Sequence, residues 1–362
     1  MGQRNHNANI VFIMLGNSCN MNCVYCLQHP LVNEPLSKRV NPRIYNFLAK
    51  LAMENSSGKI HLRFYGGEPL LYFPVIREMA EELYVRKIPA TYSVITNGRA
   101  LTDEMVDFFC GENFNVTVSW DGYKTGETRK FDVMQDAEIR KRILHLSHLG
   151  LSGVISAKAY PIEILEAFQE ISDEYEDIHH EEIRINLDEI FDTGIASKCL
   201  LAVDYNRISH DMRRLTALYL DVANGGEYRR SDRTKVAYMA GFIRKLWHFY
   251  VVECGEWDSS FAACGNGTSV LNLDLDGYLY PCHNTSRSIG DITTPYETYM
   301  GRLLKGDGTN GRRSTCLACS ALPYCKGGCK LVGEKARAET YCKLKRAMVE
   351  PVLEVLQNYG KK

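Results

Sequence analysis

The sequence predicts an α/β fold: a partial TIM-like (β/α)6 barrel, then a small loop-rich, cysteine-rich domain and a terminal helix. Two observations predict it. Up to about residue 190, strand-like and helix-like segments alternate, and repeated strand–helix units imply a parallel sheet with right-handed crossovers. From residue 254 to residue 342 the chain holds eight of its 13 cysteines and few long periodic runs. A region with so small a core needs extra stabilisation, which bound metal can supply.

The expected elements follow one another along the chain. Strands are expected at Ala8–Leu15, Lys59–Tyr65, Tyr92–Thr96, Val116–Trp120, Val154–Ala159 and Glu182–Leu187. Helices are expected at Pro42–Glu54, Val75–Val85, Asp103–Cys110, Ala137–Leu149 and Ile162–Ile171. Asn41 and Thr102 are placed to cap the first and third helices, because short polar side chains accept hydrogen bonds from free backbone N–H groups. Residues 191–250 look helical, and Lys343–Tyr359 is expected to form the terminal helix.

Composition narrows the class of protein. The 43 basic and 44 acidic side chains leave a formal charge of −1, without the basic excess of a nucleic-acid-binding protein. No apolar run is long enough for a membrane span and the polar N-terminus does not resemble a secretory signal, so the cytoplasm is the expected location. Cysteines that cluster at short spacings in a reducing compartment indicate metal binding rather than disulfides.

The first cysteine motif follows the first predicted strand. Cys19, Cys23 and Cys26 have the spacing C-x3-C-x2-C. Three thiolates can hold three irons of a four-iron cluster and leave the fourth iron without a protein ligand. An open coordination position is where a substrate or cofactor binds a metal, and strand ends are where barrels carry chemistry. The same spacing also permits a zinc site with His29 as the fourth ligand.

This motif, read as C-x3-C-x-Tyr-C with Tyr25 as its aromatic residue, resembles the cluster motif of the radical S-adenosylmethionine (SAM) superfamily. Segments similar to the family's SAM-binding motifs end the later predicted strands: Gly66, Gly67, Glu68 and Pro69 (GGEP), Asn97 in Thr96–Gly98, Ser119 and Asp121 in S-x-D-G, and Ser156. The resemblance implies that the GGEP segment binds the amino group of SAM and that Ser119 or Asp121 binds its ribose. Each segment alone is also an ordinary turn, but their joint occurrence at successive strand ends favours cofactor binding.

The C-terminal cysteines resemble a SPASM domain, the auxiliary iron–sulfur domain of many peptide- and protein-modifying radical SAM enzymes. Its cysteines are Cys264, Cys282, Cys316, Cys319, Cys325, Cys329 and Cys342. The resemblance implies two further four-iron clusters, with Cys254 as the eighth ligand. One would use Cys254, Cys264, Cys282 and Cys329, and the other Cys316, Cys319, Cys325 and Cys342. Without Cys254, the first of these clusters would have an open iron for a substrate thiolate. The alternative is a zinc ribbon built from Cys316, Cys319, Cys325 and Cys329.

We therefore divide the chain into a radical SAM partial barrel at residues 1–195, a helical linker at 196–250 and a SPASM-type domain at 251–362. The implied cofactors are SAM and three [4Fe-4S] clusters. By resemblance, the reduced first cluster cleaves SAM to a 5′-deoxyadenosyl radical, which takes a hydrogen atom from the substrate. The substrate radical then couples, or is oxidised by an auxiliary cluster. The implied partners are a peptide or protein substrate and a reductant such as flavodoxin or ferredoxin.

The substrate is open among three interpretations. The enzyme forms a thioether or carbon–carbon crosslink in a ribosomally made peptide, makes formylglycine as sulfatase maturases do, or oxidises or epimerises a peptide or small molecule. His283 follows Cys282 where sulfatase maturases carry an Asp, which weakens the second interpretation; His283 acts as a base or supports a cluster sulfur. The first strand starts near residue 8, which leaves no room for a leader-binding domain, so a separate leader-binding protein or direct recognition is expected. A non-enzymatic iron–sulfur electron carrier is disfavoured by the open iron and the SAM-type motifs.

Overall fold

The computed structural model describes residues 8–28, 38–192, 194, 198–252, 269–305, 316–329 and 331–359. Its strands are β1 (Ile10–Met14), β2 (Ile60–Tyr65), β3 (Ala90–Thr96), β4 (Asn115–Ser119), β5 (Leu149–Ile155), β6 (Arg184–Glu189), β7 (Val270–Asp274), β8 (Tyr278–Tyr280) and β9 (Gly290–Asp291). Its helices are α1 (Arg43–Glu54), α2 (Phe73–Val85), α3 (Asp103–Gly111), α4 (Thr125–Thr128), α5 (Ala137–Leu144), α6 (Pro161–His179), α7 (Lys198–Leu201), α8 (Tyr205–Ala223), α9 (Arg233–Val252), α10 (Tyr296–Lys305), α11 (Leu322–Cys325), α12 (Glu334–Ala336) and α13 (Cys342–Tyr359).

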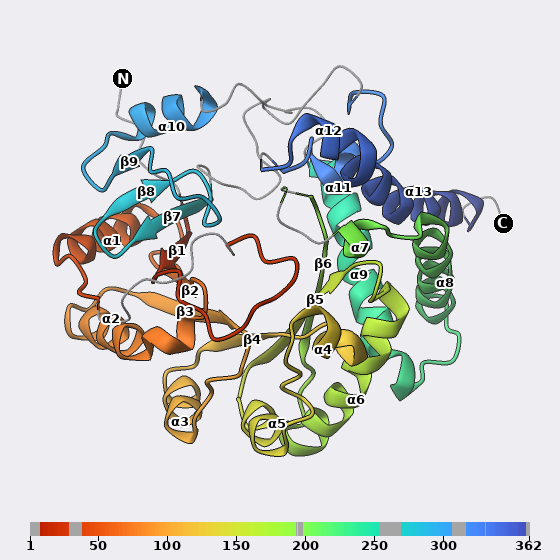
Figure 1. The fold of residues 1–362 in the computed structure, drawn as a ribbon, viewed down its shortest axis with the longest axis horizontal. Helices are drawn as coiled ribbons and strands as arrows, with labels where there is room; N and C mark the ends of the chain where they lie inside the picture. The colour runs from red at the N-terminus through yellow and green to blue at the C-terminus, as the bar shows by residue number, and fades with distance from the viewer. Residues whose placement is uncertain are drawn as a thin grey trace.

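All nine of these strands form one sheet, in the order β6-β5-β4-β3-β2-β1-β7-β8-β9. The first six are parallel, and each pairs with its neighbour in the sequence. Figure 1 shows the sheet curving around a central space, with helices on its outer side and the loop that follows β1 inside the curve. The predicted α/β partial barrel is therefore confirmed. Among the residues described, no helix combines the length and hydropathy needed to cross a bilayer.

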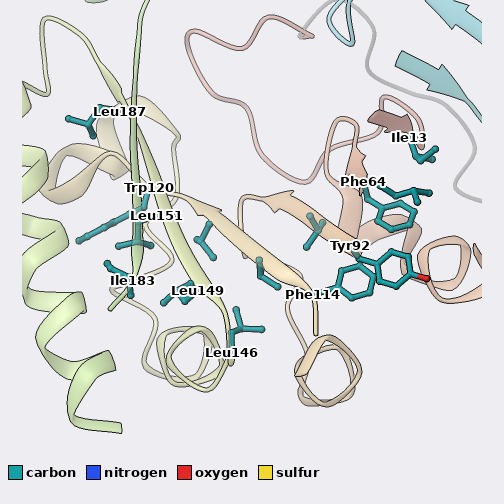
Figure 2. Packing of buried hydrophobic residues seen from close by; sticks show 14 of the residues in the cluster. Ile13, Phe64, Tyr92, Phe114, Trp120, Leu146, Leu149, Leu151, Ile183 and Leu187 are labelled. Atoms are coloured by element: carbon teal, nitrogen blue, oxygen red, sulfur yellow. The ribbon is translucent and has the colours of Figure 1, made fainter. Parts of the chain in front are cut away.

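Alternation along the strands produces two different faces. In β2, buried positions alternate with partly exposed ones, and Leu62 and Phe64 are fully buried. The outer side chains pack together and against the helices; the Phe114 ring, for example, lies 4.9 Å from the Tyr92 ring of β3 and 5.0 Å from the Phe109 ring of α3, between centroids. Figure 2 shows part of this core, including Phe64, Tyr92 and Phe114. The inner face carries the alternate, partly exposed positions.

The C-terminal region contains more regular structure than expected. Strand β7 pairs in parallel with β1, in the register Ile10 to Val270, and β8 returns antiparallel to it. The turn between them is built on Asp274, whose Oδ1 accepts hydrogen bonds from the backbone N–H groups of Gly277 (2.9 Å) and Tyr278 (2.8 Å). Gly277 has a φ of +97°, which favours glycine. This hairpin extends the barrel sheet. The division of the chain into a barrel, a linker and a SPASM-type domain at residues 195 and 250 stays a prediction.

The fifth strand was placed wrongly from the sequence. The helix predicted to reach Leu149 ends at Leu144, and the strand begins at Leu149 instead of Val154. Glycines lie inside this strand because other segments of the protein pass close to its backbone. A Cβ on Gly153, for example, would lie 2.9 Å from Ile164 Cγ2 of α6. The helix predicted at Ile162–Ile171 is longer and continues to His179. The other predicted elements of the barrel agree with the structure to within a few residues, and α13 confirms the terminal helix.

The two predicted helix caps both make hydrogen bonds. Thr102 Oγ1 accepts from the backbone N–H of Met105 at 3.3 Å, at the start of α3. Asn41 Oδ1 accepts from the N–H of Arg43 at 3.1 Å, although Pro42 occupies the cap position of α1 itself. Both hydrogen bonds satisfy backbone donors that the first helical turn leaves free.

Candidate active site

The loops that carry the predicted motifs lie together at the carboxyl ends of the strands. The loop that contains Cys19, Cys23 and Cys26, called the cysteine loop below, follows β1. The GGEP segment follows β2, and Asn97 follows β3 directly. Asp121 lies two residues beyond β4. Figure 1 shows the cysteine loop crossing the inside of the curved sheet. The carboxyl edge of a parallel barrel is where active sites form, so the motifs stand where chemistry is expected.

The two glycines of the GGEP segment hold the cysteine loop in place. Gly67 N donates to Gly16 O at 2.9 Å, and Glu68 N donates to Ser18 O at 2.8 Å. A Cβ on Gly66 would lie 2.5 Å from Gly16 O, and a Cβ on Gly67 would lie 2.4 Å from Ser18 O. Side chains cannot occupy such distances, so glycine is required for the approach of two backbone segments. The glycines thus position the loop that leads into Cys19.

Glu68 joins the end of β2 to the end of β3. Its carboxylate is buried and accepts hydrogen bonds from Leu70 N (2.9 Å), Thr96 Oγ1 (2.6 Å) and Asn97 N (2.8 Å). Burial raises the pKa of Glu68, although these three hydrogen bonds act in the opposite direction. Glu68 therefore orients Asn97, and its pairing with an ammonium group stays a prediction.

Asn97 connects this arrangement to the first cysteine. Its Nδ2 donates to Asn20 Oδ1 at 2.8 Å and lies 3.8 Å from Cys19 Sγ. Arg99 Nη1 donates to the carbonyl of Asn20 at 2.6 Å. The Cys19 end of the loop is thus held by residues that follow β3, and an amide donor faces the sulfur.

Asp121 anchors the other end of the cysteine loop. Its Oδ2 accepts hydrogen bonds from Tyr25 Oη at 2.5 Å and Thr128 Oγ1 at 2.6 Å. Its Oδ1 accepts from Arg129 Nη2 at 3.1 Å and Val154 N at 2.9 Å. Four donors use the acceptor capacity of a carboxylate. Asp121 therefore positions Tyr25 between Cys23 and Cys26, and its contact with a ribose stays a prediction.

The two predicted serines occupy different surroundings. Ser119 is the last residue of β4 and pairs in register with Ser152 of β5. Ser156 is fully buried, and its Oγ accepts from the backbone N–H of Lys158 at 3.3 Å. This hydrogen bond belongs to the turn between β5 and α6, where Ser156 N also donates to Ala159 O at 2.9 Å. The SAM-binding roles of both serines stay predictions.

Arg129 is a residue that the sequence analysis did not identify. Its guanidinium is buried, forms the ion pair with Asp121 and lies over the Tyr25 ring, 5.4 Å from the centroid. Burial lowers its pKa, but the charges of Asp121, Tyr25 and Cys23 and the hydrogen bond to Asp121 together exceed this effect, so the net pKa is raised. Its Nε has no hydrogen-bond partner in the part of the chain that the structure describes. A buried donor of this kind suits an anionic ligand group.

The three thiols of the motif lie within electrostatic reach of one another. Burial raises the pKa of Cys23 to about 11; Arg129 opposes this, and the thiolates of Cys26 and Cys19 add to it. Burial also raises the pKa of Cys19. Thiolates gathered in this way repel one another until a metal centre binds them, and binding then releases their protons.

The three cysteine sulfurs are the type and number of ligands that a four-iron cluster with one open iron requires. Within the described ranges, no three His, Cys, Asp or Glu side chains are placed to hold one metal ion. In a four-iron cluster each thiolate binds a different iron, so the sulfurs need not converge on one point. The zinc alternative depends on His29, which lies outside the described residues.

A cavity of about 360 Å³ opens beside the cysteine loop. Its lining is Cys19, Asn20, Met21, Asn22, Arg99, Arg129, Lys130 and Phe131. The Arg99 guanidinium covers the Phe131 ring at 4.6 Å from its centroid. The volume lies within the range of small-molecule sites, and the walls combine cations, amides and one thiol. This cavity is the candidate position of a cofactor bound next to Cys19.

Part of the second cysteine set is also assembled. Burial raises the pKa of Cys325 to about 11, and the neighbouring Cys342 and Cys319 thiolates contribute to the increase, while Lys345 opposes it. These three cysteines belong to one predicted cluster and come from α11, α13 and the turn before α11. Cys254 and Cys264 lie outside the described residues, so the other predicted ligand set stays a prediction.

His283 lies on the inner side of the sheet, next to Cys282. Its ring stacks on Phe12, with centroids 4.4 Å apart and planes 7° apart, and meets the Tyr65 ring edge-on at 4.5 Å. Burial, and then the charge of Arg63, lowers the pKa of His283 to about 4, so the imidazole is neutral at neutral pH. Its Nδ1 is buried without a hydrogen-bond partner among the described residues.

Tyr65 links the two cysteine sets. Burial raises the pKa of its hydroxyl, and the thiolates of Cys26 and Cys282 raise it further. The hydroxyl donates to Asn284 Oδ1 at 3.3 Å. The cysteine loop makes a second contact with this region, because Gln28 Nε2 donates to His283 O at 3.2 Å. Tyr65 therefore lies near both Cys26 of the first motif and Cys282 of the second.

Comparisons with known proteins agree with this geometry. Residues 13–148 match the radical SAM superfamily. The chain is 21% identical over 342 residues to a cysteine-type anaerobic sulfatase-maturating enzyme of Clostridium perfringens, covering 86% of both chains. Across the curated relatives it matches, the chain spans from 26% to 86% of their length.

Solved structures are similar in fold. Native anSMEcpe with bound AdoMet matches with a TM-score of 0.65 and 16% identity, over 97% of this chain and 99% of that one. Streptococcus suis SuiB bound to the precursor peptide SuiA matches with a TM-score of 0.58 and 14% identity, over 90% of this chain and 72% of that one. Both likenesses extend beyond the barrel into the C-terminal region.

Proposed function

The chain carries a radical SAM domain at residues 13–148, and we propose on that basis that it is a peptide-modifying enzyme that forms a thioether or carbon–carbon crosslink. The observation that carries the proposal is the proximity of the two cysteine sets: Tyr65 lies within electrostatic reach of both Cys26 and Cys282, and Gln28 of the cysteine loop donates a hydrogen bond to the carbonyl of His283. Relatives whose names describe sulfatase maturation, and a structural neighbour bound to a precursor peptide, support a polypeptide substrate.

In this proposal Cys19, Cys23 and Cys26 hold the first four-iron cluster and SAM occupies the cavity beside Cys19. When bound, the cofactors supply the radical that removes a hydrogen atom from the substrate, and an acceptor for one electron. The chain's own contribution is to orient the cysteine loop. Asn97 directs an amide N–H at the Cys19 sulfur, and hydrogen bonds to cluster sulfurs tune the reduction potential.

The two auxiliary clusters are part of the same proposal. Their ligands are those predicted from the sequence: Cys254, Cys264, Cys282 and Cys329 for one cluster, and Cys316, Cys319, Cys325 and Cys342 for the other. The proximity of Cys319, Cys325 and Cys342 supports the second set. A reductant such as flavodoxin or ferredoxin, and a separate leader-binding protein, complete the proposed partners.

His283 is the proposed base near the substrate. With its pKa lowered to about 4, the imidazole is unprotonated at neutral pH, the state from which a base accepts a proton, and it is a weaker base than an exposed histidine. Its stacking between Phe12 and Tyr65 fixes the ring in one orientation.

The second candidate is formylglycine formation, as in the Clostridium perfringens relative. The similarity to that enzyme over 86% of both chains favours it. The residue after Cys282 is His283, whereas a resemblance to sulfatase maturases predicts an Asp at this position. This difference weakens the sulfatase interpretation and so favours crosslinking.

Mass spectrometry separates the candidates. Reduced, cluster-reconstituted enzyme with SAM is incubated with peptides encoded beside its gene and, separately, with a sulfatase-derived cysteine peptide. Crosslinking removes two hydrogen atoms and joins two residues, so fragmentation between them is lost. Formylglycine formation yields an aldehyde that a hydrazide reagent captures. The Cys23→Ala variant is the control. SAM cleavage with every peptide left unchanged would contradict a peptide substrate.

A further inference from the structure

The inner face of the sheet carries two arginines, Arg63 and Arg184, near Tyr65 and His283, where we propose that the substrate reacts. Arg63 lies in β2, at a position that alternates with the buried Leu62 and Phe64. Arg184 is the first residue of β6 and extends over Gly150 of β5 to Asn115 of β4. Both arginines belong to the face opposite the helices, because their neighbours in the strands fill the outer core.

The two guanidinium groups approach each other across β3 and β4, because Arg63 hydrogen-bonds Ser93, Ser93 pairs in register with Asn115, and Arg184 hydrogen-bonds Asn115. Arg63 is half-buried and Arg184 is exposed. Burial lowers the pKa of Arg63, and the charge of Arg184 lowers it further. His61 lies near both: burial and then the charges of Arg63 and Arg184 lower its pKa to about 4. His61 is therefore neutral at neutral pH and holds Thr91 Oγ1 (2.9 Å) and Ser93 Oγ (2.8 Å) by hydrogen bonds. The positive charge on this face resides on the two arginines.

Neither arginine has a carboxylate partner within 4.0 Å among the residues described. Arg63 Nε donates to Ser93 Oγ at 3.2 Å. Arg184 donates to Asn115 Oδ1 and, at 2.7 Å, to the carbonyl of His148. All these acceptors are neutral. By contrast, the buried Arg129 does have a carboxylate partner, Asp121, and the role of that ion pair is structural.

Like charges held near each other repel, and the repulsion is screened less at the half-buried Arg63 than at the exposed Arg184. An anion that enters with a ligand would offset this repulsion. Arg63 is suited to bind it: Phe12 supports one face of its guanidinium, with the ring centroid 5.2 Å away, and no partner of its Nη atoms is found in the described ranges. A guanidinium stacked in this way presents a planar edge that matches a carboxylate.

The position of Arg63 connects this site to the proposed chemistry. Arg63 precedes Tyr65 by two residues in β2, which is about 7 Å along a strand. The Phe12 ring contacts both the Arg63 guanidinium and the His283 ring. A ligand anchored at Arg63 would therefore have its next atoms directly below Tyr65 and His283.

We propose that Arg63 and Arg184 form a carboxylate-binding site on the inner face of the barrel, which anchors the substrate by a C-terminal carboxylate or an Asp or Glu side chain. This proposal rests on the proposed function, since it specifies the class of peptide that the same interior accepts. The expected substrate is a peptide whose carboxylate, from its C-terminus or from an Asp or Glu side chain, lies near the residue that reacts.

The test measures carboxylate binding without turnover. Full-length, cluster-reconstituted protein is treated anaerobically with phenylglyoxal, which modifies accessible arginines, and the modified sites are identified by mass spectrometry. The probes, at matched ionic strength, are acetyl-triglycine, its C-terminal amide, and an acetyl-Gly-Glu-Gly amide. We expect the first or third probe to slow modification of Arg63 and Arg184 several-fold, and the triglycine amide to have no effect. Protection by acetyl-triglycine identifies a C-terminal carboxylate, and protection by the Glu peptide identifies a side chain.

Variants sharpen the test. Arg63→Gln should weaken protection of Arg184 about tenfold, equivalent to about 1.4 kcal/mol. Arg63→Lys keeps the charge but loses the planar edge and should give an intermediate result. Arg213→Gln is the matched control, because Arg213 already pairs with Glu354 at 2.7 Å on the outside of the molecule.

Equal protection by acid and amide probes, or protection unaffected by Arg63→Gln, would refute the site. Because no SAM cleavage is required, this failure is distinguishable from failure of the proposed function, which would leave carboxylate binding intact.

Discussion

At the scale of single residues, the ion pair of Asp121 and Arg129 determines how the cysteine loop is held. Asp121→Asn leaves the buried Arg129 charge without its partner and weakens the hydrogen bond to Tyr25. We expect this variant to lower the free energy of unfolding by about 3 kcal/mol. Urea denaturation followed by circular dichroism measures the change.

The control for Asp121 is Asp103→Asn. Asp103 pairs with Arg142 at the surface, where solvent screens the interaction. We expect its unfolding curve to match that of the unchanged protein. Equal stability of the two variants would show that Asp121 does not anchor the loop.

The residues of the site differ in how far the sequence predicts them. Cys19, Cys23 and Cys26 are predictable because a short cysteine spacing is itself a chemical pattern. Arg129 and Arg63 are not, because an arginine has no local signal that distinguishes a surface cation from a buried one. Only the fold shows that Arg129 meets Asp121 and that Arg63 has no carboxylate partner among the residues that the structure describes.

At the scale of elements, the contact between the loop after β1 and the loop after β2 requires glycine. Gly67→Ala would place a Cβ 2.4 Å from Ser18 O and force the two backbones apart. We expect a loss of about 1–3 kcal/mol in unfolding free energy and less iron retained after reconstitution. Gly126→Ala is the matched control, because nothing lies within 4 Å of its added Cβ. Equal iron content in both variants would contradict the role given to the GGEP glycines.

The same scale explains which elements the sequence predicts. Strands β1 to β4 and their helices follow clear hydrophobic periods, and the structure confirms them. In β5 the glycines Gly150 and Gly153 look like helix ends and turns, whereas they serve close packing against Thr117 Oγ1 and Ile164. The strands β7 and β8 are short, and their pairing with β1 depends on a contact between residues far apart in the sequence. A local pattern does not contain such a contact.

At the scale of the whole molecule, a buried ion pair fastens the C-terminal region to the last barrel strand. Lys345 Nζ of α13 lies 2.7 Å from Glu189 Oε1 at the end of β6, and both residues are 9% exposed. Lys345→Met leaves Glu189 buried and unpaired, with an expected loss of about 3–5 kcal/mol in unfolding free energy. The double variant Lys345→Met/Glu189→Leu should recover most of it, because no charge stays buried alone. Additive losses in a double-mutant cycle would refute this role of the pair.

The central claim is that Cys19, Cys23 and Cys26 hold a cluster that activates SAM. The most direct measurement is 5′-deoxyadenosine, quantified by liquid chromatography and mass spectrometry after anaerobic reconstitution, reduction with dithionite and addition of SAM. The unchanged protein should release 5′-deoxyadenosine and methionine, and the Cys23→Ala variant should release neither. Absence of 5′-deoxyadenosine from a protein that retains its iron, or equal release by Cys23→Ala, would contradict the account.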